Sequence, residues 1–272
     1  HSRAAKPCSR SRKHSSLRRL LAPHGQVSNL RDIAMQFRLQ TAVALLLAPL
    51  ITAAPQTTTE WLRSEAGSDW TRITTDPFVE QLAAGTLPNA TLARYLVQDH
   101  KFVDAFMVLL ASMVARAPSL EDRVPGAKFL GLIAGDENSY FLRSFDALGL
   151  SEAEIHAPPA PVTKRFDALM RKAAASGKLH EMLAVLVVAE WSYLTWGEAV
   201  QPVAGLSWLH LEWIDLHRGD YFASVIAYLR SQLDKLELTK RQRREARAAF
   251  LEAVACEKAF WEMARGVGEG EL

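Results

Sequence analysis

Apolar side chains recur every three or four positions almost everywhere from Thr57 to the end of the chain. This spacing is that of one face of an α-helix, whereas the apolar residues of a half-buried strand recur at every second position. The same stretch lacks Asn-Gly and Asp-Gly pairs, the strongest short signals for a β-hairpin. The sequence therefore predicts an all-α fold, most simply a single bundle of seven or eight helices.

Prolines, glycines and capping residues divide this stretch into separate helices. Asp76 and Pro77 suit the N-cap and the first turn of one helix. Asn89 is predicted to cap a long helix that ends at about residue 116. The same signals predict helices at about residues 126–148, 163–175, 179–200, 220–236 and 239–265, the last two capped by Asp220 and Thr239. Residues 202–211 are predicted to be a loop or a short turn.

Residues 1–56 differ in composition from the rest of the chain. Between residues 2 and 40 there are nine arginines and lysines and a single acid, Asp32, which is typical of a mitochondrial transit segment. Alternatively, translation from Met35 would give a short basic segment, an apolar run over 41–51 and a small-residue cleavage site, as in a secretory signal. A third alternative is an extension that has no role in the fold. We predict a basic N-terminal extension over 1–56 and one folded domain over 57–272.

The composition excludes several classes of function. The chain has 32 basic and 30 acidic side chains in 272 residues, so the domain has no charge excess that would attract nucleic acid. Cys8 lies in a basic context and Cys256 in an apolar one, which predicts neither a disulfide framework nor a thiolate metal site. The common nucleotide, zinc-protease and serine-hydrolase motifs are absent, as are the paired Glu-x-x-His motifs of di-iron bundles. No metal is expected.

Three carboxylates interrupt the apolar rows of three separate predicted helices. Asp99 lies between Leu96 and Phe102, and Glu190 and Glu257 occupy comparable positions in their own helices. Because burying an unpaired carboxylate is costly, such groups are paired, hydrogen-bonded, protonated or exposed to a wet cavity. We expect either one shared polar pocket inside the bundle or three structural salt bridges. Nearby aromatic residues would stack on a flat heteroaromatic ligand or serve as plain core: Phe102, Phe166, Tyr193 and Phe260.

The segment Asp76–Phe106 reads DPFVEQLAAGTLPNATLARYLVQDHKFVDAF. It is similar to the signature of the TenA/thiaminase II (TENA/THI-4) family, in which an H/D-P-F element is followed by G-x-L-P and then by Y-x-x-Q-D. The resemblance extends from about Trp61 to Arg265 and includes WSYLTWGE at 191–198 and EKAFW at 257–261. The Y-x-x-Q-D element and the final E-x-x-F-W element are specific in combination.

This resemblance implies a heme-oxygenase-like helical bundle, usually a homotetramer, with a dimer as the alternative. Members of the family hydrolyse the amino group of aminopyrimidines derived from thiamine, and some cleave thiamine itself. They use no metal and no organic cofactor. The implied partner is a small-molecule pyrimidine, with no nucleic acid and no membrane. The implied location is cytoplasmic, unless residues 1–56 direct the chain to mitochondria or out of the cell.

The resemblance also assigns roles to individual residues. Asp99 matches the aspartate that contacts the substrate pyrimidine, and Glu257 matches the glutamate that handles protons at the ring. Substrate-binding positions are implied for Asp99, Phe102, Phe166, Tyr193, His217 and Phe260. Phe166 stands where a tyrosine is common, and His217 falls near another such tyrosine.

One branch of the family has a nucleophilic cysteine at the position that matches Ala189. A second branch lacks this cysteine and carries a glutamate in the region, and this chain resembles the second branch because Glu190 follows Ala189. The expected function is therefore a carboxylate-based, cofactor-free aminopyrimidine aminohydrolase. In it Glu190 acts as general base on water, while Asp99 and Glu257 orient and protonate the ring. Cys256 is no substitute, because its neighbour Glu257 takes the inward position on the same helix.

Three other interpretations remain open on the sequence. A protein of this fold could bind a pyrimidine as a regulator without catalysis. It could also be a different enzyme of the heme-oxygenase-like fold, such as a cofactor-free ring-oxidising enzyme or a di-iron oxidase. A purely structural bundle would use the three acids in salt bridges.

Overall fold

The computed structural model describes residues 56–267. The predicted N-terminal extension, with its transit and signal alternatives, lies outside the described residues except for Gln56. The described part is α-helical with one π-helical turn and contains no strand, so the predicted all-α class is confirmed. In chain order the elements are α2 (Thr58–Ala66), α3 (Ser68–Thr74), α4 (Pro77–Ala84), α5 (Asn89–Arg116), α6 (Leu120–Leu132), η1 (Ile133–Glu137), α7 (Asn138–Ala147), α8 (Glu152–Ile155), α9 (Pro161–Ser176), α10 (Leu179–Ala199), α11 (Trp208–Leu216), α12 (Gly219–Asp234) and α13 (Lys240–Ala264).

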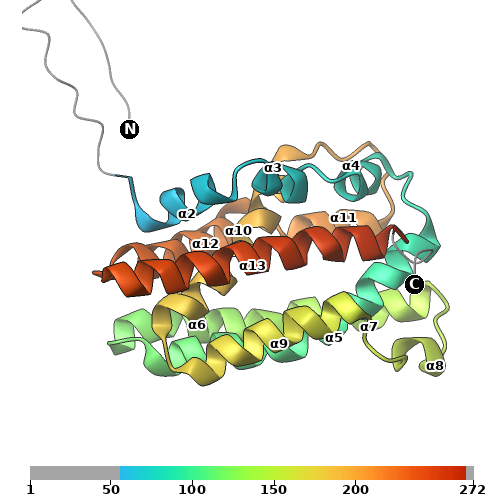
Figure 1. The fold of residues 1–272 in the computed structure, drawn as a ribbon. Coiled ribbons are helices and arrows are strands. Elements are labelled where there is room, and N and C mark those ends of the chain that lie inside the picture. The colour runs from blue at the N-terminus through green and yellow to red at the C-terminus, as the bar shows by residue number, and fades with distance from the viewer. Residues whose placement is uncertain (1–55, 268–272) are drawn as a thin grey trace, which may run out of the picture. The chain divides into compact units, whose positions relative to one another are not determined.

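Helix α10 is the centre of the bundle. It packs against α5, α9, α12 and α13, and Figure 1 shows α5, α6 and α9 in one layer beneath α10, α12 and α13. Every residue from Met182 to Ala189 is buried. A helix that is apolar on all sides must be covered on all sides, which explains why this segment takes the central place.

The predicted ends of several helices are confirmed by their caps. The side chain of Asp76 accepts a hydrogen bond from the Phe78 amide (2.9 Å), and Pro77 occupies the first turn. Thr239 and Gln242 form a reciprocal capping box at the start of α13. Asn89 is not the cap of α5, because the amides of the first turn already bond to the carbonyl of Pro88.

The predicted helix 126–148 is present as continuous helical backbone, but it starts earlier and contains a π-turn that the sequence did not predict. Helix α6 begins earlier, where the Ser119 side chain accepts from the Asp122 amide. The π-turn η1 then separates α6 from α7. A π-turn holds one more residue than an α-turn and still continues the helix. Apolar spacing alone does not reveal such an insertion.

The segment between α10 and α12 also differs from the prediction. Of the predicted loop 202–211, residues 202–207 are non-helical as predicted, whereas 208–211 belong to helix α11, which has Leu209, Trp213 and Ile214 buried. Helix α12 starts at Gly219, after Arg218, so Asp220 lies in the first turn and is not the cap. Its negative charge still favours the helix start through the helix dipole. The described residues therefore form more helices than the predicted seven or eight, the additional ones being short.

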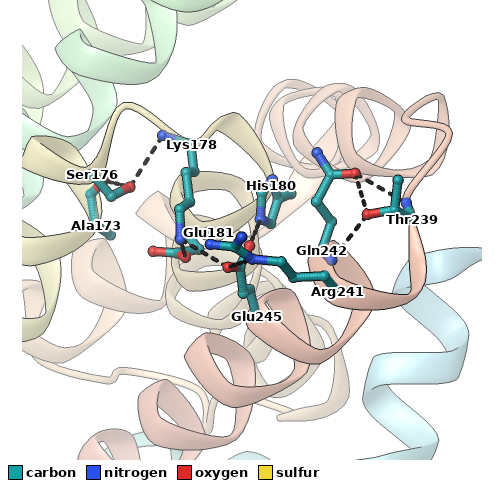
Figure 2. A network of polar contacts seen from close by, with 9 residues as sticks. All are labelled: Ala173, Ser176, Lys178, His180, Glu181, Thr239, Arg241, Gln242 and Glu245. Atoms are coloured by element: carbon teal, nitrogen blue, oxygen red, sulfur yellow. Dashed lines mark hydrogen bonds and ion pairs between the residues drawn. The ribbon is translucent and has the colours of Figure 1, made fainter.

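A network of charged groups joins the start of α10 to the start of α13 (Figure 2). The Lys178 ammonium donates to Glu181 (2.7 Å) and to Glu245 (3.0 Å), while His180 Nε2 and Arg241 Nε lie 3.0 and 2.9 Å from Glu245. Hydrogen bonds from Lys178, Arg241 and His180 lower the pKa of Glu245 to about 2. His180, Glu181 and Glu245 have ligand atoms within 4.8 Å of one another. Since Lys178 already binds both carboxylates, this cluster is an ion-pair clamp that fixes two helix starts.

None of the helices within residues 56–267 combines the length and the apolar character needed to cross a membrane.

Gly197 allows the last turn of α10 to lie directly on the backbone of His217. A Cβ atom at this position would lie 2.2 Å from the His217 carbonyl oxygen and 2.9 Å from its carbonyl carbon. The contacted atoms belong to the backbone and cannot rotate away, so any larger residue must push the two segments apart.

We therefore expect Gly197→Ala to lower the free energy of unfolding by about 1–3 kcal/mol, the range of an overpacked core position. Gly131→Ala is the matched control, because a Cβ there meets no atom within 4 Å. That control should raise stability by roughly 0.5–1 kcal/mol, the helix preference of alanine over glycine. Urea unfolding of the three proteins measures both effects. Equal stability of Gly197→Ala and wild type would contradict the close approach.

Candidate active site

A cavity lies inside the bundle, enclosed by residues from α5, α6, η1, α9, α10, α11, α12 and α13. The space open to the centre of a water-sized sphere is about 40 Å³, which is enough for ordered water. The lining residues are Asp99, Phe102, Val103, Phe106, Phe129, Leu132, Glu137, Phe166, Ala189, Glu190, Tyr193, Leu216, His217, Phe222, Glu257 and Phe260. All eight site residues predicted from the sequence are among them, although they come from five separate parts of the chain.

The three predicted carboxylates meet in this cavity without a basic partner. Asp99 is 7% exposed and Glu257 is 3% exposed, while Glu190 is half-buried. Among the lining residues there is no lysine or arginine. None of the three forms an ion pair within the described part of the chain, so the salt-bridge alternative finds no support there. Burial raises the pKa of each carboxyl well above its ordinary value, and the neighbouring acids raise it further.

Sequence reasoning missed a fourth carboxylate, Glu137. It is the last residue of the π-turn and is half-buried at the cavity wall. Burial raises its pKa from 4.5 to about 7. The signal was present in the sequence, since Glu137 precedes the buried Tyr140 and Phe141 by three and four residues. It interrupts an apolar row in the same way as Asp99 does.

Two tyrosines, Tyr95 and Tyr193, form a hydrogen-bonded pair at the cavity. The hydroxyl oxygens of Tyr95 and Tyr193 lie 2.7 Å apart, and Tyr95 is fully buried. The Tyr95 side chain lowers the pKa of Asp99, against the larger effect of burial. Burial raises the pKa of both tyrosines well above 10, so both keep their protons. Tyr193 lines the cavity and therefore offers it a neutral hydroxyl group.

His217 enters the cavity as a neutral ring. Its Nδ1 lies 2.7 Å from the carbonyl oxygen of Trp213, which can only accept, so Nδ1 carries the proton. Burial lowers the pKa of His217 to about 4. The remaining ring nitrogen, Nε2, is then an acceptor, and His217 supplies no positive charge to the four acids.

Aromatic rings form much of the remaining wall. The centroids of Phe102 and Phe166 lie 4.9 Å apart with an interplanar angle of 64°, and Phe260 lies 6.4 Å from Phe102. The ring centroids of Tyr193 and His217, which also line the cavity, are 4.9 Å apart. Such tilted rings present both faces and edges, which suits a flat ring system inserted among them.

No cysteine of the described residues lines the cavity. The position expected for a nucleophilic thiol is Ala189, which lies in the wall. Cys256 is fully buried outside the lining, and burial raises the pKa of its thiol to about 12. A thiol of this kind stays protonated and is a poor nucleophile.

A helical bundle that holds an acidic, aromatic cavity between its long helices belongs to the class of all-α proteins with an internal small-molecule site. The sequence model of the TENA/THI-4/PQQC family matches residues 64–266, and the chain therefore belongs to this family. The family resemblance found in the sequence is thus confirmed.

Relatives agree with this assignment. The chain is 26% identical over 208 residues to the aminopyrimidine aminohydrolase of Bacillus subtilis (strain 168), covering 75% of this chain and 88% of that protein. It is 23% identical over 210 residues to the aminopyrimidine aminohydrolase of Helicobacter pylori, covering 75% and 97%. Among solved structures, a TenA homologue from Pyrococcus furiosus has a TM-score of 0.69 at 21% identity, covering 76% of this chain and 99% of that one. This structural similarity supports the fold.

The raised pKa of Glu137 predicts how stability depends on pH. Below about pH 4.5 the carboxyl is protonated in both the folded and the unfolded chain, so it has no effect. Between about pH 4.5 and 7 the unfolded chain loses this proton first, and the folded state becomes less stable as pH rises. Glu137→Gln cannot ionise. We therefore expect it to exceed wild type in stability by roughly 1–3 kcal/mol at pH 8 and to match it at pH 4.

Urea unfolding at pH 4, 6 and 8 measures this difference. Asp136→Asn is the control, because Asp136 belongs to the same π-turn but is exposed. Its curves should follow those of wild type. The same loss of stability with pH in Glu137→Gln and in wild type would show that Glu137 does not titrate in the cavity.

Proposed function

We propose that this protein is a cofactor-free aminopyrimidine aminohydrolase, which releases ammonia from thiamine-related pyrimidines without a cysteine nucleophile. The observation that carries the proposal is a cavity with four carboxyl groups, aromatic walls and neither a thiol nor a lysine or arginine. The names of the two bacterial relatives support the same reaction.

The carboxyl groups of the cavity, which have no lysine or arginine beside them, favour a weakly basic ring as the ligand. An aminopyrimidine presents an amidine edge, which donates from its amino group and accepts at its ring nitrogen. Buried carboxyls that have no cation beside them hydrogen-bond such an edge and stabilise its protonated form. One metal ion would need three ligand atoms close together. Among the described residues, the group whose ligand atoms lie within 4.8 Å of one another is His180, Glu181 and Glu245, and it contains none of the four acids. An extended organic ligand therefore suits this donor set better than a single ion.

Asp99 and Glu257 hold and protonate the amidine edge. They are the most deeply buried of the four acids and lie on facing helices, α5 and α13. Protonation of the ring makes the carbon that bears the amino group more electrophilic. Tyr193 and Tyr95 extend this polar contact through their linked hydroxyls.

Glu190 is the general base. In this step its carboxylate takes a proton from water while the water oxygen bonds to the ring carbon. The carbon–nitrogen bond then breaks, its electron pair stays on nitrogen, and ammonia leaves after gaining one proton. The ring returns its extra proton, and the product is the hydroxypyrimidine. The carboxyl groups exchange only protons with water and substrate, and the new carbon–oxygen bond is formed by water, so no covalent enzyme intermediate is formed.

The test is ammonia release by the purified full chain offered 4-amino-5-aminomethyl-2-methylpyrimidine, its N-formyl derivative and thiamine. We expect turnover of an aminopyrimidine and none of thiamine. Glu190→Gln should lower kcat by about 100-fold or more with little change in KM, the effect of losing a general base. Glu198→Gln is the control, because Glu198 lies on the same helix and is exposed. It should keep wild-type activity.

Two outcomes would contradict the proposal. Full activity of Glu190→Gln would remove Glu190 from the mechanism. Tight binding of all three compounds without turnover would identify a pyrimidine-binding or regulatory protein on the same fold.

The working unit that we propose is residues 57–272, acting as a homo-oligomer in the cytoplasm unless residues 1–56 direct the chain elsewhere. The start of the domain is supported by Thr57, whose hydroxyl caps α2. Size-exclusion chromatography with light scattering distinguishes a tetramer, a dimer and a monomer.

A further inference from the structure

The proposed reaction leaves one proton unassigned. An amino group does not leave carbon as the amide anion, because that anion is far too basic, so nitrogen must be protonated as the bond breaks. Asp99 and Glu257 serve the ring, and Glu190 serves the water. The role of proton donor to nitrogen is open, and Glu137 is the one acid of the cavity lining without a role.

The local structure around Glu137 has no evident purpose in packing. Gly131 and Gly135 lie in or beside the π-turn at ordinary helical angles, and a Cβ at either position would meet no atom within 4 Å. Each glycine costs a helix about 1 kcal/mol relative to alanine. Ile133 is the only buried residue of the turn. π-Turns occur preferentially at functional sites, and the functional group that this one delivers to the cavity is the Glu137 carboxyl.

Glu137 shares the cavity with the proposed base, Glu190, and with Asp99, which holds the ring. Among the charged neighbours of Glu190, Glu137 raises its pKa most, ahead of Glu257 and Asp99. Glu137 is also the only charged neighbour that raises the pKa of Asp99. Water and the amino group share one ring carbon, so their base and acid must lie close together.

Burial separates the four acids into two pairs. Asp99 and Glu257 are almost fully buried, whereas Glu137 and Glu190 are half-buried. The more deeply buried pair is suited to holding the ring. The more exposed pair is suited to exchanging protons with water, to admitting the attacking water and to releasing ammonia.

We propose that Glu137 is the general acid of the reaction and passes its carboxyl proton to the departing amino group. This proposal rests on the proposed function. Glu190 accepts one proton from water, the hydroxyl oxygen bonds to carbon, and the Glu137 O–H proton bonds to nitrogen. The carbon–nitrogen electron pair stays with nitrogen, which leaves as NH3. Glu137 is then a carboxylate and Glu190 is a carboxylic acid, and the transfer of one proton from Glu190 to Glu137, directly or through water, restores both. A pKa of about 7 suits a proton donor at neutral pH.

The test changes the leaving group. A 4-chloro analogue of the accepted aminopyrimidine loses chloride, which leaves as an anion and needs no proton. We expect Glu137→Gln to lower kcat on the amino substrate by about 100-fold or more and to leave turnover of the chloro analogue close to wild type. Glu190→Gln should slow both substrates, since both need activated water. Asp136→Asn should change neither.

A pH profile gives a second, independent measurement. A general acid must be protonated, so kcat of wild type on the amino substrate should fall as pH rises above about 7. Glu137→Gln should lose this alkaline decline. The other titratable groups of the cavity are Asp99, Glu190, Tyr193, His217 and Glu257, and His100 bonds Asn138 beside the turn. These side chains remain in the variant, but removal of Glu137 lowers the pKa of Asp99 and Glu190. Turnover of the chloro analogue uses the same groups without a proton donor to nitrogen, so its pH profile measures that shift separately.

Each remaining outcome overturns the proposal. Equal loss on both substrates would make Glu137 a positioning residue or the water base, and full activity on the amino substrate would exclude any role. If the wild-type protein turned over the chloro analogue but not the amino substrate, water would be activated while the leaving nitrogen received no proton. Turnover of neither substrate by wild type would reject the proposed function itself, which separates that failure from an error about Glu137.

Discussion

The protonation of the site and its choice of ligand both depend on the free-energy cost of placing four carboxyl groups in one largely apolar cavity. Ionised acids in such surroundings are tolerated only with a nearby cation, and the cavity wall has none. Without a ligand the protonated forms are therefore favoured, and burial raises the pKa of Asp99, Glu190 and Glu257. Burial of apolar side chains in the surrounding core, including every residue of α10 from Met182 to Ala189, offsets this cost. A ligand that brings positive charge relieves the same cost.

The bundle holds each acid on a different element, so no single helix defines the site. Asp99 is on α5, Glu137 on η1, Glu190 on α10 and Glu257 on α13. Their positions depend on how these helices are fixed against one another. The ion-pair clamp around Glu245 fixes the starts of α10 and α13, and the glycine contact at 197 sets the distance between the end of α10 and His217. Rigid helices are better supports than loops for groups that must exchange protons.

Much of the fold and the site was predictable because helices repeat their faces at a fixed spacing. The inward positions of Asp99, Glu190 and Glu257 followed from that spacing, and the structure brings them together. Glu137 was overlooked although it interrupts an apolar row, because the π-turn shifts the register within what reads as one helix. The link between Tyr95 and Tyr193 joins two helices that are far apart in the sequence, and the sequence of neither helix alone indicates it. Helix α11 was missed because its nine residues show too little periodicity to separate it from a loop.

The presence of four carboxyl groups and the absence of a thiol among the described residues that line the cavity have a chemical consequence. Carboxyl groups do not react with peroxide, with disulfides or with thiol-directed electrophiles, whereas a catalytic thiolate is consumed by all three. The one thiol of the described residues, Cys256, is inaccessible and protonated. If the proposed chemistry at Asp99, Glu137, Glu190 and Glu257 holds, an oxidant that inactivates a catalytic thiolate leaves these four groups chemically unchanged.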